Sequence, residues 1–177
     1  LNETQTHQIL EDVRNRFSDI GILYLSKENE SVLTKLLEEY DLQFYELLSA
    51  SPHVFLRRGH PLAQRPLLKL EDLKPYPRLS FVQGNYESAY FSEELFSTVP
   101  VEKSIKVSDR AAIVNLMIGV DGYTISSGIF PKYLQGDDIV FLPLDEQETM
   151  RIGYVINRDK ELSELGRIYV EALKKFR

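Results

Sequence analysis

The chain of 177 residues contains no cysteine, and this absence removes several kinds of chemistry at once. Disulfide bonds, thiolate metal sites and cysteine nucleophiles all need a residue that the sequence does not have. A chain without cysteine suits a reducing compartment, and we expect the cytoplasm. An apolar content of 43% and a charged content of 27% are ordinary for a globular chain, and a chain of this length can fold without a covalent staple.

Positive charge is also scarce. The 21 Lys and Arg residues are outnumbered by 27 Asp and Glu residues, which gives a formal net charge of −6. A domain that grips phosphates usually presents a basic face, so we do not expect this chain to bind nucleic acid by itself. No run approaches the ~18 apolar residues of a transmembrane helix. No basic-then-apolar signal segment opens the chain, and its abrupt start a few residues before a predicted helix suggests a fragment.

The sequence lacks the short motifs of the common enzyme classes. It has no GxSxG nucleophile elbow and no P-loop, and Gly119-Val120-Asp121-Gly122 does not follow the GxGxxG pattern. His7, His53 and His60 are too far apart in sequence to read as a metal pair, and we interpret each as a structural histidine. We therefore predict no catalytic residue, no bound metal and no cofactor, and we do not expect an enzyme.

Clustered charges are the remaining candidates for reactive groups. Glu38-Glu39 lies on the polar face of a predicted helix and Asp137-Asp138 lies in a predicted turn, so solvated charge is the simpler interpretation of both. Arg57-Arg58 follows a predicted strand. This pair could form an anion-binding site. We favour the interpretation that it is a solvated edge of the fold or forms an ion pair between two lobes of the chain.

Hydrophobic periodicity predicts helices and strands in alternation. We expect helices over residues 4–17, 32–40, 68–73, 88–96, from 108–109 onward, in a short segment ending at 133, and from 163 onward. We expect strands over residues 20–25, 42–48, 54–57, 79–82, 101–107, 122–125, 139–142 and 150–157. This alternation predicts an α/β fold with a mainly parallel sheet.

Two helix ends and two helix faces carry more specific expectations. Thr4 or Thr6 is expected to cap the first helix, and Ser108 the helix that begins near it, because a hydroxyl accepts the free amide hydrogens there. The apolar stripe of the helix that begins near Ser108 is expected to bury residues 113, 116, 117 and 120. The stripe of the last helix is expected to bury residues 165, 168, 169, 172, 173 and 176.

Small polar residues gather where predicted strands give way to helices. In open α/β sheets, ligands bind beyond the carboxyl ends of the strands, and free amides at helix N-termini favour anions. Capping for stability alone is the alternative explanation at each junction. The junctions are Thr4-Gln5-Thr6, Gln83-Gly84-Asn85, Ser108-Asp109 and Ser126-Ser127-Gly128.

Four stretches carry a resemblance to a known family. The most specific is His60-Pro61-Leu62-Ala63 followed by Leu70-Glu71-Asp72-Leu73. The others are VRNRFSDIGIL at 13–23, IVNLMIGVDGYT at 113–124, and residues 151–167. Together they extend over nearly the whole chain, which resembles the C-terminal effector-binding domain of LysR-type bacterial transcriptional regulators.

The resemblance implies two Rossmann-like lobes joined by two crossover segments, as in periplasmic binding proteins. Lobe I would comprise residues 1–56 and 152–177, and lobe II residues 57–151. The family domain normally opens with a strand, a helix and a strand, and we expect these three elements to be missing from lobe I here. The family's N-terminal winged helix-turn-helix, which contacts DNA, is also absent from this sequence.

The resemblance further implies that a small polar or anionic metabolite binds in the interlobe cleft and modulates a DNA-bound oligomer. The partners would be this effector and further copies of the chain, in a homodimer or homotetramer. DNA would be contacted only through the absent N-terminal domain, and no membrane partner is expected. Carried over by position, the effector-binding residues are Thr4, Thr6, Tyr24, Gln83, Gly84, Asn85, Ser126 and Ser127.

Two other functions share a similar lobed fold. One is a solute-binding protein of a transport system, which a signal or lipoprotein peptide upstream would favour. The other is an enzyme such as a deaminase or dehydratase, and the lack of a nucleophile, metal set or acid/base pair counts against it.

Overall fold

The computed structural model describes residues 1–84, 88–129 and 138–176. Its contacts divide the chain into two compact units. Unit 1 comprises Leu1–Ser49, Gln83–Phe91 and Met150–Arg177, and unit 2 comprises Ala50–Val82 and Ser92–Thr149. The segment Gln83–Phe91 therefore makes its contacts with unit 1, although the sequence on both sides of it belongs to unit 2.

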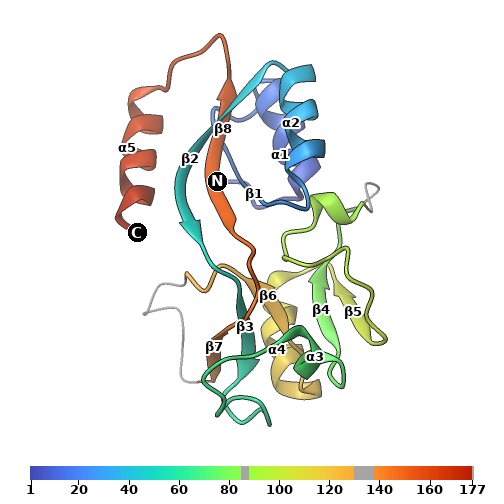
Figure 1. Ribbon diagram of the computed structural model, residues 1–177. Helices are drawn as coiled ribbons and strands as arrows, with labels where there is room; N and C mark the ends of the chain where they lie inside the picture. Colours follow the sequence, from blue (N-terminus) through green and yellow to red (C-terminus); the bar gives the residue numbers. More distant parts are fainter. Residues whose placement is uncertain (85–87, 130–137, 177) are drawn as a thin grey trace. The chain divides into compact units, whose positions relative to one another are not determined.

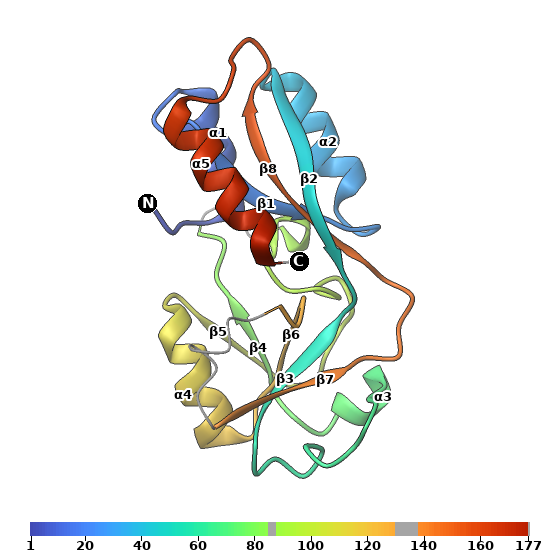
Figure 2. The same ribbon diagram turned by 90° about the vertical axis from the view of Figure 1, so that its left-hand side faces the viewer.

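Unit 1 is built from the elements α1 (Thr6–Arg14), β1 (Gly21–Leu25), α2 (Glu30–Glu39), β2 (Leu42–Ala50), the 3-10 helix η1 (Ala89–Phe91), β8 (Met150–Asn157), α5 (Glu164–Leu173) and the 3-10 helix η2 (Lys174–Phe176). Its sheet has the strand order β1-β8-β2. β1 runs antiparallel to β8, with Gly21 opposite Val155. Figures 1 and 2 show α1 and α2 on one side of this sheet and α5 on the other.

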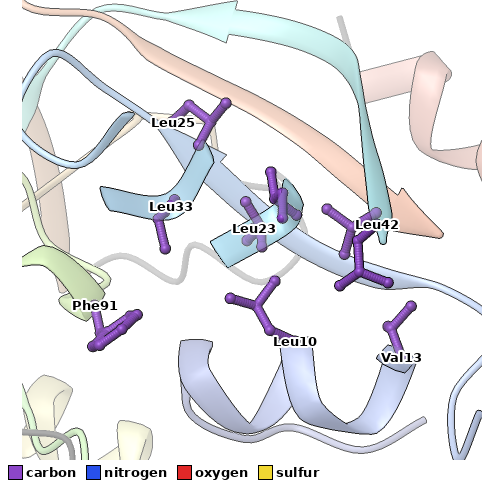
Figure 3. Packing of buried hydrophobic residues seen from close by; sticks show 9 residues of the cluster. Leu10, Val13, Leu23, Leu25, Leu33, Leu42 and Phe91 are labelled. Carbon is purple, nitrogen blue, oxygen red and sulfur yellow. The ribbon is translucent and has the colours of Figure 1, made fainter. Parts of the chain in front are cut away.

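The core of unit 1 joins the inner faces of α1 and α2 to the sheet and to Phe91 (Figure 3). Leu10 and Val13 are one helical turn apart on α1, and both are fully buried. Each buried leucine contributes roughly 1.5–3 kcal/mol through the hydrophobic effect. Phe91 belongs to the same cluster, so its side chain fixes one end of the segment Gln83–Phe91 in unit 1.

Unit 2 is built from β3 (His53–Arg57), α3 (Leu70–Leu73), β4 (Arg78–Phe81), β5 (Ser104–Val107), α4 (Arg110–Val120), β6 (Thr124–Ser126) and β7 (Ile139–Pro143). β3 lies between β6 and β7 and is antiparallel to both. β4 pairs in parallel with β5. A core that includes Leu79, Met117 and Ile139 packs between α4 and these strands.

The expectation of a mainly parallel sheet is wrong for the pairings that the structure describes. β4 and β5 are parallel, whereas β1 with β8 and β3 with β6 and β7 are antiparallel. Alternation of strand and helix implies a parallel sheet only when consecutive strands are neighbours in one sheet. Here the neighbours of β1 and β3 come from distant parts of the sequence, so hydrophobic patterns alone could not give their direction.

The HPLA stretch forms a turn in unit 2 in which His60 and Leu62 are buried. The Leu62 amide donates to His60 Nδ1 at 3.1 Å, and His60 Nε2 lies 3.2 Å from the backbone oxygen of Asp121. Asp121 ends α4 in the left-handed conformation, with φ 51°, and its carboxylate forms an ion pair with Arg57. The side chains of His60 and Arg57 therefore hold the end of α4. Arg57 is engaged in an ion pair inside unit 2, not between lobes.

Three local expectations are corrected. α1 begins at Thr6 after Gln5, and neither Thr4 nor Thr6 caps it. α4 is capped by Asp109, whose carboxylate accepts from the Ala111 amide at 2.7 Å, and not by Ser108. The helix expected over residues 88–96 is the single turn η1, and Phe96 takes a left-handed φ of 60° that a helix does not tolerate. The segment expected to end at Tyr133 and the turn that includes Asp137 lie outside the described residues.

α5 turns a different face inward from the one expected. Leu165, Ile168 and Tyr169 are 79%, 60% and 40% exposed, whereas Gly166 and Val170 are buried. A Cβ at Gly166 would lie 3.2 Å from Ile20 Cδ1, so the absence of a side chain lets the helix backbone approach closely at this position. Within the part of the chain that the structure describes, no helix has the length and apolar content to cross a membrane.

Candidate ligand-binding site

The start of α1 receives an unusual partner. The first amides of a helix have no acceptor within the helix, and the residue before it normally supplies one. Gln5 holds that position, and its side chain makes no capping bond. The Thr6 amide instead donates to Gln83 Oε1 at 3.2 Å, from a residue 77 positions away. The structure thus brings two of the sequence-predicted site residues together.

The second polar group of the Gln83 side chain, its Nε2, makes no described hydrogen bond. The residue is 6% exposed, and its Nε2 is buried without a hydrogen-bond partner among the described residues. A buried donor left unpaired costs about 1–3 kcal/mol, so such a group calls for a partner. The side chain therefore offers an N–H beside the positive end of α1.

Gly84 brings the chain close to the same helix end. Its φ of 58° lies in the left-handed region, which glycine adopts without strain. A Cβ at Gly84 would lie 2.9 Å from Gln5 Oε1. A side chain at this position would therefore disturb both the backbone of residues 83–84 and the start of α1.

His7, in the first turn of α1, packs against Phe91. Their rings meet edge to face, with centroids 5.5 Å apart. Burial lowers the pKa of His7, and the nearby Glu11 only partly opposes this effect. The imidazole is therefore neutral at physiological pH, and attraction of an anion would come from the amides and the dipole of α1. The first turn of α1 carries no acidic residue that would weaken this attraction.

The end of β1 supplies a further polar group that the sequence reasoning missed. Tyr24, which was expected at this strand end, is partly buried within β1. Ser26 follows the strand, is 3% exposed, and has no partner for its Oγ among the described residues. Its amide donates to Asn29 Oδ1 at 2.8 Å, which fixes the turn. A signal was present, because Ser26 is the first polar residue after the apolar run.

The other predicted site residues belong to several different parts of the chain. Ser126 ends β6 and Ser127 follows it, both in unit 2. Ser127 Oγ accepts from the Ile129 amide at 3.2 Å, so it already has a local structural role. Thr4 belongs to unit 1 and is partly buried. Asn85 lies outside the described residues.

Carboxylates and histidines in the described part of the chain are the remaining groups that could support catalysis or metal binding. Across residues 1–84, 88–129 and 138–176, no three His, Cys, Asp or Glu residues form a group that could hold a metal ion. Glu94 is a buried carboxylate in unit 2, and burial raises its pKa. It accepts hydrogen bonds from the Phe81 amide at 2.9 Å and from Ser92 Oγ at 2.6 Å.

Comparisons with known proteins show the family and the fold of the chain. The family model described as LysR substrate binding domain matches residues 1–177. A comparison with curated protein sequences gave no match. Similar solved structures include HinK, a LysR family transcriptional regulator from Pseudomonas aeruginosa, with 16% identity and a TM-score of 0.66 over 98% of this chain and 58% of that chain. This chain thus spans little more than half the length of that regulator.

Two other solved structures cover more of their own length. The oxidized form of OxyR has 22% identity and a TM-score of 0.67, over 99% of this chain and 80% of that chain. The effector-binding domain of QuiR in complex with shikimate has 22% identity and a TM-score of 0.62, over 97% of this chain and 76% of that chain. At these identities the structural likeness establishes the α/β fold of two lobes.

Proposed function

This chain belongs to the family of LysR substrate-binding domains, and from that premise we propose that it senses a small polar or anionic metabolite at the start of α1. The single observation that carries the proposal is the buried, unpartnered Nε2 of Gln83 beside the first amide of α1. A carboxylate of the effector would accept from this N–H. The positive end of the α1 dipole favours the same charge.

The remaining contacts are assigned around this anchor. Thr4, Tyr24 and Ser26 would complete the site from unit 1, with Gly84 keeping the chain close to α1. Asn85, Ser126 and Ser127 remain in the proposed set of effector contacts. Ser26 is added to the set because its buried hydroxyl has no partner among the described residues.

The regulatory consequence follows from linkage. An effector shifts an equilibrium between two conformations only by the difference in its affinity for them. We propose that it binds one of these two conformations better and so changes the geometry of a homodimeric or homotetrameric regulator. In a full-length regulator of this family, DNA would be contacted by an N-terminal domain. A transport function is not favoured, because the family is one of regulator domains.

The test is a thermal-shift screen of the 177-residue chain with a panel of small carboxylates. A ligand at 100 times its Kd adds about 2.7 kcal/mol to stability, which raises the Tm of a chain of this size by about 5–10 °C. Each hit is paired with its amide or alcohol analogue as a control. Equal shifts with the neutral analogues would contradict the anionic class, and no shift with any member would contradict binding at this site.

A further inference from the structure

The segment Gln83–Phe91 makes an excursion from one unit to the other. The chain leaves unit 2 after Val82 and returns to it at Ser92. At one end of the excursion Gln83 bonds the Thr6 amide, and at the other Phe91 packs in the core of unit 1. The position of Gln83 therefore depends on what holds the two ends of this segment.

A single carboxylate holds both ends. Glu94 Oε1 accepts from the Phe81 amide at 2.9 Å, two residues before the excursion begins. Glu94 Oε2 accepts from Ser92 Oγ at 2.6 Å, at the first residue after it ends. The strand and the loop are thus tied together at the base of the segment, although Phe81 and Ser92 are separated by the whole excursion.

The residues after Glu94 are themselves fixed to unit 2. The Leu95 amide donates to the backbone oxygen of Ile125 at 3.3 Å, and Arg78 donates to that of Phe96 at 2.7 Å. Glu94 is therefore held by its own backbone neighbours as well as by its side-chain bonds. It is a rigid point from which the base of the excursion is positioned.

A carboxylate is a costly choice for a purely structural tie. Glu94 is 6% exposed, and burial raises its pKa, with an additional contribution from the charge of Glu93. The bonds from Ser92 and from the Phe81 amide lower the pKa and only partly offset burial. A glutamine could accept from the same amide without burying a charge. Both oxygens of Glu94 are nevertheless engaged at the base of the segment that carries Gln83.

We propose that Glu94 is a positioning residue for the effector site, which ties the two ends of the segment Gln83–Phe91 and so sets Gln83 against α1. The meaning of this role for effector binding rests on the proposed function. The geometric claim itself concerns only how Gln83 is held.

The test follows amide hydrogen exchange at Thr6 by NMR in the 177-residue chain. Exchange reports local opening, and the Thr6 amide is bonded to Gln83. Glu94→Ala should accelerate exchange at Thr6 about tenfold, as expected from loss of hydrogen bonds to a charged group. Gln83→Ala gives the rate when the bond is removed directly. Glu94→Gln should stay within about twofold of wild type, because its Oε1 still accepts from the Phe81 amide and its Nε2 can donate to Ser92 Oγ, whose hydroxyl also accepts.

Two amides separate positioning from simple loosening. The Ile9 amide donates to the backbone oxygen of Gln5 inside α1, and the Val82 amide donates to that of Val107 in unit 2. Faster exchange at Thr6 with unchanged exchange at Ile9 supports the proposal. Faster exchange at Val82 with an unchanged rate at Thr6 would overturn it and leave Glu94 a local tie within unit 2.

Ser92→Ala provides a milder variant in case Glu94→Ala does not fold. It removes the bond to Glu94 at the returning end and should accelerate exchange at Thr6 by a few fold. An unchanged Thr6 rate in this variant, with a faster rate in Gln83→Ala, would also overturn the proposal. No effector is used, so a failed carboxylate screen would count against the proposed function and not against this measurement.

Discussion

At the scale of single residues, the hydrogen bonds and burial of His60 determine its protonation state. His60 accepts a hydrogen bond at Nδ1 from an amide, which requires that this nitrogen carry no proton. Burial lowers the pKa of His60, and Asp121 only partly opposes this effect. His60 therefore works as a neutral ring that holds a turn, as the sequence suggested when it gave no catalytic role to this residue.

This state predicts how stability depends on pH. Because the pKa of His60 is lower in the folded chain than in the unfolded chain, the unfolded chain binds more protons below about pH 6.5. The contribution of His60 is thus fully present above that pH and is lost as the pH falls. Urea unfolding at pH 7.5 and 5.5 should show a smaller loss of stability for His60→Ala than for wild type. Equal losses in the two proteins would contradict the neutral assignment.

Gly84 offers a second test at this scale. Gly84→Ala places a Cβ on a residue with φ 58° and 2.9 Å from Gln5 Oε1, so it should destabilise the chain by about 1–2 kcal/mol. Gly119→Ala is the matched control, because a Cβ there meets nothing within 4 Å and lies inside α4. That control should be neutral or stabilising by up to about 1 kcal/mol. Thermal unfolding of both variants checks the pair, and the opposite order would refute this account of Gly84.

At the scale of elements, helix caps show how far local patterns reach. The start of α4 was predicted to within a residue, but Ser108 was predicted as its N-cap in place of Asp109. Both residue types are good caps, so propensity alone does not separate them. β8 was predicted with its observed bounds, because its ends are marked by polar residues.

The cap of α4 can be measured directly. Asp109→Ala removes the acceptor of the Ala111 amide and should cost about 1 kcal/mol of unfolding free energy. Ser108→Ala should change that free energy by less than about 0.5 kcal/mol. Urea denaturation of the two variants distinguishes them. A larger loss for Ser108→Ala would restore the cap that the sequence suggested.

The face of α5 was not predictable from periodicity. Leu165, Ile168 and Tyr169 form an apolar stripe in sequence, yet the helix packs through Gly166 and Val170. Close packing through a glycine leaves no mark on a hydrophobic pattern, because glycine adds no apolar side chain.

The candidate site shows the same limit of prediction from the sequence. Thr6 and Gln83 were each predicted, but the hydrogen bond between residues 77 positions apart depends on how the chain folds.

At the scale of the whole molecule, the predicted α/β fold and the LysR resemblance are confirmed by the family match over residues 1–177. Motifs such as HPLA report the fold because they specify buried turns, as the bonds of His60 illustrate. They say little about the effector, since the contacts that we propose for it come from a few polar atoms such as Gln83 Nε2. The lobe limits, oligomeric state and effector contacts remain proposals.

The central claim is that Gln83 Nε2 donates to an anionic effector. Isothermal titration calorimetry of a carboxylate hit against Gln83→Glu tests it most directly. The new carboxylate still accepts from the Thr6 amide, but it replaces the N–H donor with negative charge. Affinity should fall at least about 100-fold, the effect of losing a buried charged hydrogen bond. Gln64→Glu, an exposed change of the same charge in unit 2, should keep affinity within about twofold. Unchanged affinity in Gln83→Glu would contradict the account.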